Sequence, residues 1–254
     1  MALRRSERLL AAARAAKGFM PDDEGCALAR LAERAARAGY ESIVEVGAYC
    51  GRSTLYLASG VAAATEDHEI AWAPADRRDL PQEGKGPVTG RIGDVPATVV
   101  LSVDHHHGSE ENQAGWEHHD PSLVDPTTGR IDTLLNWRSA VERAGAEDLA
   151  IAVVGDSRSV ARRLGGDVGV VFIDGGHGEE PAWSDYRGFA PLVRLGGWLA
   201  IHDVFEDPSE GGRPPFEIWC AALASMEFEQ LPALGCGSLK VLRRIAEARP
   251  AGGG

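Results

Sequence analysis

The sequence contains no run of apolar residues long enough to cross a lipid bilayer, and it shows no signal-peptide pattern. It therefore predicts a cytoplasmic protein that does not span a membrane. The first 20 residues are rich in arginine and alanine, as transit peptides are, but their apolar residues recur with the spacing of a partly buried amphipathic helix. We expect a helical segment over residues 1–39, whose amphipathic start is also a candidate surface for a homodimer.

Cysteine and basic residues are both scarce. The four cysteines are far apart and form no C-x-x-C pair, so they predict buried thiols in a reducing compartment and do not favour a disulfide framework or a structural zinc site. Acidic residues outnumber basic ones by 38 to 26, which gives a formal net charge of −12. Because a nucleic-acid-binding protein needs a basic surface to neutralise phosphates, this balance argues against an RNA or DNA substrate.

What the sequence does contain is an alternation of short apolar runs and helical segments. Five runs have the β-branched, apolar character of buried parallel strands: 42–46, 98–103, 149–154, 168–173 and 198–201. Helical periodicity is found over 22–38, 53–59 and 134–144. Two further strand-like runs, 228–234 and 238–243, flank a Gly-Cys-Gly turn. The pattern predicts an α/β fold: a Rossmann-like, doubly wound, mostly parallel sheet of seven strands that ends in an antiparallel hairpin.

Two polar segments interrupt this alternation. Residues 62–96 are rich in glycine and proline, and residues 105–132 carry five of the eight histidines. Loops of this length in a compact domain are usually lids or binding loops, or else disordered. The histidines indicate either a transition-metal site or, as we favour, a polar lid, because adjacent histidines on an extended chain point in different directions. We expect one domain over 40–246 that contains both insertions, followed by a disordered tail over 247–254.

The loop after the first predicted strand has the features of a ligand-binding turn. Ligands of open parallel sheets bind beyond the carboxyl ends of the strands. Here Gly47 and Gly51 allow the backbone to turn sharply and to approach a ligand, and Ser53 is placed to cap the following helix. A dinucleotide-binding loop, G-x-G-x-x-G, needs a glycine where this chain has Tyr49, so the loop argues against NAD and FAD.

Carboxylates also close the later strands. Asp104 ends the second predicted strand, and its two carboxylate oxygens suit the vicinal diol of a ribose. Asp156 follows the third strand. Taken singly, each acid is better explained as a helix cap or a solvated loop residue. Together, at the carboxyl ends of successive strands, they favour a binding site.

The fourth and fifth strands carry the most informative residues. Asp-Gly-Gly-His follows the buried run 170–173, which places Asp174 and His177 at its carboxyl end. The next strand ends in Ile-His-Asp, with His202 and Asp203. On adjacent strands Asp174 and Asp203 would converge, and two carboxylates in a cleft repel one another unless a proton or a cation lies between them. Oxygen ligands of this kind suit Mg²⁺ or a related divalent ion.

Three motifs together resemble those of class I S-adenosylmethionine (SAM)-dependent methyltransferases, and among these the macrocin O-methyltransferase and cephalosporin-hydroxylase-like family. They are E-x-G-x-x-x-G-x-S-T over 45–54, I-D-G-G-H over 173–177 and I-H-D over 201–203, within a loose similarity over 40–243. A hairpin after the fifth strand is another feature of this class. The resemblance implies that SAM is bound by Glu45, Gly47, Tyr49, Gly51, Ser53, Thr54, Asp104, Asp156, Ser157 and Asp174.

The same resemblance implies a metal-assisted active site. Asp174, His202 and Asp203 would hold Mg²⁺ or another divalent cation; Asp174 and His177 would be the catalytic residues, with His177 as the general base. The chain departs from the family pattern at two points. Gly176 stands where a second aspartate is common, and His202 replaces one member of an acidic pair.

The function implied is transfer of a methyl group from SAM to a hydroxyl of a small molecule such as a sugar, a glycoside or another natural product. The enzyme would hold the two reactants in line, the metal would lower the pKa of the hydroxyl, and His177 would take its proton. Two alternatives remain. One is a metal-dependent hydrolase or hydroxylase that uses Asp174, His177 and Asp203; the other is a SAM-binding domain without catalytic activity.

Overall fold

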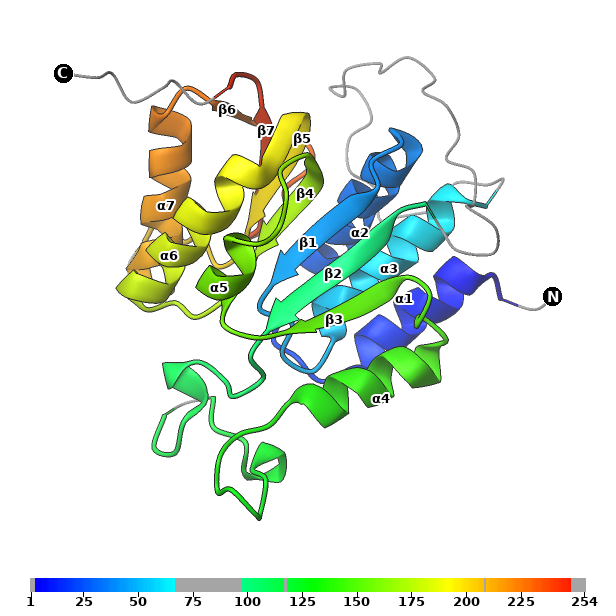
Figure 1. Ribbon diagram of the computed structural model, residues 1–254, viewed down its shortest axis with the longest axis vertical. Coiled ribbons are helices and arrows are strands. Elements are labelled where there is room, and N and C mark those ends of the chain that lie inside the picture. The colour runs from blue at the N-terminus through cyan, green and yellow to red at the C-terminus, as the bar shows by residue number, and fades with distance from the viewer. Residues whose placement is uncertain (1–2, 67–96, 117, 208, 248–254) are drawn as a thin grey trace.

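The computed structural model describes residues 3–66, 97–116, 118–207 and 209–247. At its centre is a seven-stranded sheet with the order β3-β2-β1-β4-β5-β7-β6 (Figure 1). The strands are β1 (Ser42–Val46), β2 (Val99–Asp104), β3 (Ala150–Val154), β4 (Val168–Ile173), β5 (Val193–Ile201), β6 (Phe228–Gln230) and β7 (Lys240–Arg244). Strands β1 to β5 are parallel, and β7 is antiparallel to both β5 and β6. The predicted Rossmann-like fold is therefore confirmed.

Helices cover both faces of this sheet (Figure 1). One face carries α1 (Arg5–Ala15), α2 (Asp22–Arg37), α3 (Arg52–Ala64) and α4 (Leu134–Ala144). The other face carries α5 (Ser157–Ala161), α6 (Glu179–Phe189) and α7 (Arg213–Ala224). Short 3₁₀ helices are η2 (Glu110–Asn112), η3 (Pro121–Leu123) and η4 (Ala190–Leu192). Among the described helices, none is both long enough and apolar enough to cross a membrane.

Alternation along the strands decides which face each strand-end residue meets. On β5, Ala200 belongs to the core beneath α1–α4, whereas Ile201 belongs to the core beneath α5–α7. Strand β4 ends with the same alternation. The next residue of each strand, Asp174 after β4 and His202 after β5, therefore returns to the side of α2.

The three central strands end at the same level. Ile173 on β4 pairs with Val46 on β1 and with Ile201 on β5. Beyond this row, the backbone amide of Asp174 donates to the carbonyl of Val46, and the amide of His202 donates to the carbonyl of Ile173. The register thus brings the residues that follow β1, β4 and β5 to one edge of the sheet.

Several expected boundaries differ in the structure. Helix α3 extends to Ala64, because its last turn is alanine-rich and buried, so the insertion expected from residue 62 begins later. The greater part of that insertion, residues 67–96, lies outside the described residues, as do residues 248–254 of the expected tail. The prediction that Ser53 caps α3 is wrong: the N-cap is Gly51, whose φ of 92° places it in the left-handed region.

The segments expected to be a long loop and a tight hairpin also have more structure than predicted. Between β2 and α4 the chain forms η2 and η3 and a bridge between Val124 and Ile131. Near the end, β6 stops at Gln230, and the chain returns to β7 through a longer connection that contains a bridge between Cys236 and Leu239. At the start, Leu9 of α1 is fully buried in the core, so the apolar pattern of this helix is explained by packing within the chain.

Candidate active site

The loop between β1 and α3 passes directly over the end of β4. Gly47 has a φ of 91°, and a Cβ atom at this position would lie 2.1 Å from the carbonyl oxygen of Asp174. Only glycine fits such an approach. On its other side the loop is held by Asp104, whose Oδ2 accepts hydrogen bonds from the amides of Ala48 and Tyr49, both at 2.9 Å. The glycine loop and the first residue after β4 are thus in direct contact.

Most of the hydrogen-bonding capacity of Asp104 is used within the protein, by backbone amides at this edge of the sheet. In addition to the two loop amides, its Oδ1 accepts a hydrogen bond from the amide of His106 at 2.6 Å. A carboxylate has about four acceptor positions, so these three bonds leave room for one more donor. Binding of a ribose diol by Asp104 stays a prediction.

Glu45 and Thr54 lie beneath the loop, with both residues fully buried. Oε2 of Glu45 accepts hydrogen bonds from the hydroxyls of Thr54 and Ser102, both at 2.6 Å, and the indole of Trp137 donates to Thr54 at 3.0 Å. Oε1 of Glu45 has no hydrogen-bond partner. Burial raises the pKa of Glu45 to about 7. These side chains support the loop from below, and their contact with a cofactor stays a prediction.

The residues after β3 form a second part of the same edge. Asp156 caps α5 by accepting a hydrogen bond from the amide of Ser159 at 3.0 Å, which is the alternative that the sequence left open for this acid. The hydroxyl of Ser157 donates to Oδ1 of Asp185 at 2.6 Å. Asp185 is buried, and burial raises its pKa to about 6. Its other oxygen lies close to Gly175, where a Cβ would be 2.6 Å away, so a side chain there would displace this carboxyl group.

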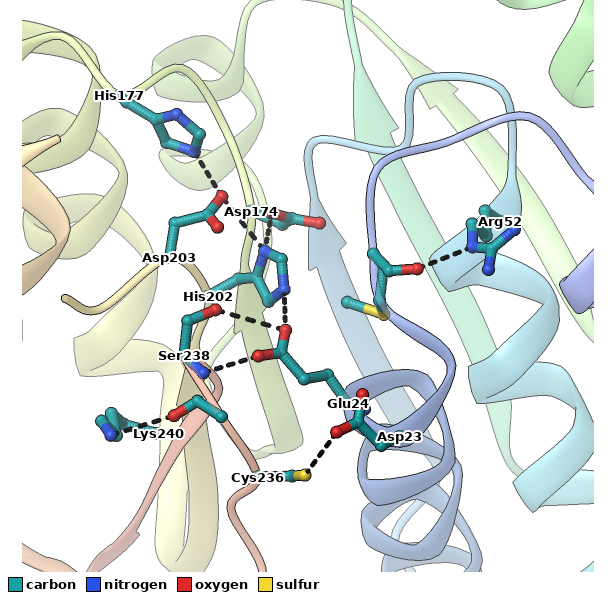
Figure 2. A network of polar contacts seen from close by, with 12 residues as sticks. Asp23, Glu24, Arg52, Asp174, His177, His202, Asp203, Cys236, Ser238 and Lys240 are labelled. Atoms are coloured by element: carbon teal, nitrogen blue, oxygen red, sulfur yellow. Dashed lines mark hydrogen bonds and ion pairs between the residues drawn. The ribbon is translucent and has the colours of Figure 1, made fainter. Parts of the chain in front are cut away.

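Three predicted active-site residues converge at the ends of β4 and β5 (Figure 2). Asp174, His177 and Asp203 each offer one ligand atom within 4.8 Å of the others. Asp203 turns toward the other two through a backbone φ of 55°. Nε2 of His177 lies 2.8 Å from Oδ2 of Asp203, and its Nδ1 lies 3.1 Å from Oε2 of Glu111 in η2.

His202 joins this cluster from the side of α2 (Figure 2). Its Nδ1 lies 3.0 Å from Oδ1 of Asp174 and 3.1 Å from Oδ2 of Asp203, yet it is buried and forms no hydrogen bond with suitable geometry. Its Nε2 lies 2.5 Å from Oε2 of Glu24. Glu24 also accepts hydrogen bonds from the amide of Ser238, at 2.5 Å, and from the hydroxyl of the same residue, at 3.2 Å.

The charges of the cluster are tightly coupled. Burial lowers the pKa of His177, but its contacts with Asp203 and Glu111 outweigh burial and raise this pKa to about 10. The same balance, with Asp174 as the nearest charge, raises the pKa of His202 well above its usual value. Burial raises the pKa of Asp174, whereas the two histidines hold the pKa of Asp203 below its usual range. Two imidazolium groups thus face several carboxyl groups, so acidic groups outnumber basic ones in the cluster.

Four residues belong to this site without any motif in the sequence that indicates it: Glu24, Glu111, Asp185 and Ser238. Glu24 was assigned to an N-terminal helical segment, and no motif links it to the I-H-D segment. Glu111 lies in the histidine-rich segment that was expected to be a lid, and its contact with His177 depends on how η2 is placed. These residues have no local sequence signal, because their contacts are made across the fold.

The histidines of residues 105–119 serve mainly to hold their own segment together. His106 is buried and pairs with the hydroxyl of Thr133 at 2.8 Å, and burial lowers its pKa. His107 and His119 lie near backbone carbonyls, at 3.1 and 2.9 Å. No group of three metal-ligating side chains forms within the described part of this segment.

A cavity of about 310 Å³ opens beside the glycine loop and this segment. Tyr49, Phe19 and His118 line it with aromatic rings; the ring centroid of Phe19 lies 5.4 Å from that of Tyr49 and 4.8 Å from that of His118. The amide of His118 donates to the carbonyl of Glu111, whose side chain reaches His177. The cavity therefore adjoins the chain segment that contacts the acid–histidine cluster.

The class I methyltransferase fold is defined by a doubly wound sheet with this strand order and a glycine loop after β1. Candidate binding residues lie at the carboxyl ends of its strands, as they do here. Residues 44–204, more than half of the chain, match the family described as "Methyltransferase domain". The chain belongs to this family. The resemblance to SAM-dependent methyltransferases is thereby confirmed, and the hydrolase or hydroxylase alternative is not favoured.

Solved structures share the fold at low identity. The SAH-bound Podospora anserina methyltransferase PaMTH1 is 12% identical, with a TM-score of 0.56 over 97% of this chain and 89% of that one. The O-methyltransferase from Bacillus cereus in complex with SAH is 15% identical, with a TM-score of 0.53 over 95% and 90%. The O-methyltransferase TomG from Streptomyces achromogenes, in complex with SAM, is 13% identical, with a TM-score of 0.53 over 97% and 92%.

Proposed function

We propose that this methyltransferase transfers the methyl group of SAM to a hydroxyl of a small molecule. The observation that carries the proposal is the contact between Gly47 and Asp174, which joins a candidate cofactor loop to a candidate catalytic cluster at one sheet edge. Structures with this fold that are described as O-methyltransferases in complex with SAM or SAH support the cofactor and the oxygen acceptor.

The loop after β1 fits the methionine end of SAM. Helix α3 begins at Arg52, and its N-cap Gly51 has no side chain to bond the first turn, so the free amide groups there are suited to a carboxylate. Glu45 lies beneath this loop, and its Oε1 is buried without a hydrogen-bond partner. Asp104 would bind the ribose with its remaining acceptor position, and Asp156 and Ser157 would lie toward the adenine. The bound cofactor supplies an electrophilic methyl group on sulfur.

The cluster fits a divalent cation. The excess of carboxylates favours a positive charge at this point, and the buried Nδ1 of His202, which no hydrogen bond occupies, is a nitrogen that could face it. Asp174, His202 and Asp203 would hold the ion, which when bound lowers the pKa of an acceptor hydroxyl.

His177 is the proposed proton acceptor. With Asp203 and Glu111 as neighbours its pKa is about 10, so the isolated protein holds this side chain protonated at neutral pH. Of the contacts that raise this pKa, the one with Asp203 is the strongest, and it would weaken if Asp203 held a divalent cation. His177 then becomes able to take a proton from the acceptor at neutral pH.

The cavity beside Tyr49 is the proposed entrance for the acceptor. Its volume of about 310 Å³ suits a small molecule, and its aromatic walls suit a flat or CH-rich surface. Holding the acceptor there, next to the loop that would carry SAM, supplies the orientation on which an in-line displacement depends.

Calorimetry with S-adenosylhomocysteine (SAH), followed by a methyl-transfer assay over a panel of hydroxylated small molecules, tests the proposal. We expect SAH to bind, and we expect Asp174→Asn and His177→Gln to retain that binding while losing at least about 100-fold of turnover. His107→Gln, which changes a histidine outside the cluster, is the matched control and should keep turnover. A protein that does not bind SAH, or variants that turn over at the wild-type rate, would refute the proposed function; SAH binding without any transfer would favour a silent domain.

A further inference from the structure

His202 is buried between carboxyl groups on two sides, and its partner on the far side, Glu24, belongs to a helix that no motif connects with the site. We propose that Glu24 is a positioning residue that orients His202 as a nitrogen ligand, and that the centre so completed takes a first-row transition-metal ion in preference to Mg²⁺. This inference rests on the proposed function for the existence of a metal centre, and it goes further in assigning the ligand orientation and the class of ion.

The contact with Glu24 determines which nitrogen of His202 carries a hydrogen. An ionised carboxylate only accepts hydrogen bonds, so Nε2 must donate across the 2.5 Å to Oε2. Glu24 cannot easily turn away, because Ser238 donates to it with both its amide and its hydroxyl. Both His202 and Glu24 are about 95% buried, so water does not compete for these bonds. Nδ1 is then the nitrogen left to face a ligand, and the proton that the raised pKa keeps on it in the metal-free protein would leave when an ion binds.

The surroundings of Nδ1 match those of a metal-ligating nitrogen. It has no hydrogen-bond partner although it is buried, and oxygens of Asp174 and Asp203 lie 3.0 and 3.1 Å away. Neighbouring ligand atoms around a six-coordinate ion with bonds of ~2.1 Å are about 3 Å apart, which is the spacing found here. A carboxylate that holds the second nitrogen of a ligating histidine is a common arrangement around protein metals.

His177 is less suited to the same task. Its two nitrogens lie 2.8 Å from Asp203 and 3.1 Å from Glu111, but its side chain is 27% exposed against 5% for His202, so water competes for its contacts and it is held less firmly. His202 can ligate without losing its bond to Glu24. One imidazole nitrogen beside two carboxylates is a mixed ligand set that suits Mn²⁺, Fe²⁺, Co²⁺ or Ni²⁺ better than Mg²⁺, which prefers oxygen.

The test titrates the metal-free, full-length protein with Co²⁺ and with Mg²⁺, by calorimetry and by the visible absorption of bound Co²⁺, in the absence of SAM. We expect Co²⁺ to bind at least 100-fold more tightly than Mg²⁺ in the wild type. Glu24→Gln should weaken Co²⁺ binding by about 10–100-fold and should shift the Co²⁺ spectrum, because a neutral amide holds and polarises the imidazole less strongly than a carboxylate. Glu33→Gln, a buried acid on the same helix that pairs with Arg37, is the matched control and should leave both unchanged.

A second variant keeps the test decisive if Glu24→Gln does not fold. In His202→Gln the side-chain amide can still donate to Glu24, but the ring nitrogen that would face the ion is gone. Its Co²⁺-to-Mg²⁺ affinity ratio should fall at least tenfold. Equal affinities for the two ions in the wild type, an unchanged ratio in His202→Gln, or no uptake of either ion would overturn the inference. Because SAH binding is measured separately, a protein that binds SAH but no metal contradicts this inference and the metal-assisted part of the mechanism, but not methyl transfer from SAM. One that binds Co²⁺ but no SAH contradicts only the proposed function.

Discussion

At the scale of single residues, Glu45 shows how the site depends on burial. Its carboxyl group is fully buried, and burial raises its folded-state pKa to about 7 from an ordinary 4.5. Folding therefore favours the protonated form. The contribution to stability is complete below pH 4.5 and is lost as the pH rises through 7, a change of about 3 kcal/mol.

This linkage predicts the behaviour of Glu45→Gln, whose amide stays neutral and can still accept from Thr54 and Ser102. Urea unfolding at a series of pH values should show the wild type losing stability relative to this variant between pH 5 and pH 8. If the free energies of unfolding of the two proteins instead change with pH in parallel across this range, the pKa of Glu45 is not raised in the folded state.

The chemistry of individual residues could be predicted from the sequence, whereas their partners could not. Asp174, His177, His202 and Asp203 were identified because a strand pattern precedes each pair. Glu24 was not, since it meets His202 across 178 positions of the chain. A motif describes neighbours in sequence, and a contact between α2 and the end of β5 exists only after the sheet and its helices have packed.

At the scale of elements, the glycine loop depends on one close approach. In Gly47→Ala the new Cβ would meet the carbonyl oxygen of Asp174 at 2.1 Å and would also strain a backbone with φ of 91°. We expect a loss of about 2–4 kcal/mol in the free energy of unfolding and weaker binding of SAH. Gly145→Ala separates the two causes, because it has a similar φ of 67° and no atom within 4 Å of its Cβ. Equal losses in the two variants would show that the contact with Asp174 contributes nothing beyond backbone strain.

Elements with a strong and uninterrupted pattern were predicted well, and those with interruptions were not. The runs 42–46, 168–173 and 134–144 have the boundaries expected from sequence. Strand β5 begins at Val193, earlier than predicted, because Gly196 and Gly197 break its apolar run without ending the strand. Pairing with β4 resumes beyond them after a register shift, since Val168 pairs with Val193 and Val170 with Trp198. Such pairing is invisible in a local pattern.

At the scale of the whole molecule, the sequence predicts that ligands meet at one sheet edge, and the register of β1, β4 and β5 explains why. Because Gly47 abuts Asp174, the proposed cofactor loop and the proposed metal cluster are in direct contact. A ligand that orders the loop should therefore favour binding at the cluster, and the reverse. We expect each ligand to raise the affinity for the other by about fivefold or more, equivalent to ~1 kcal/mol. Linkage requires the effect to be reciprocal: a saturating divalent ion should tighten SAH binding by the same factor by which SAH tightens the binding of the ion.

Calorimetric titrations of each ligand, with and without the other, measure this coupling directly. In His202→Gln, at an ion concentration that saturates only the wild type, the added ion should no longer tighten SAH binding, although the affinity for SAH alone should stay close to that of the wild type. Strict independence of the two ligands in the wild type would contradict the coupling. It would mean that the contact between Gly47 and Asp174 is already rigid before either ligand binds, and that the common edge brings the two sites together without linking their energies.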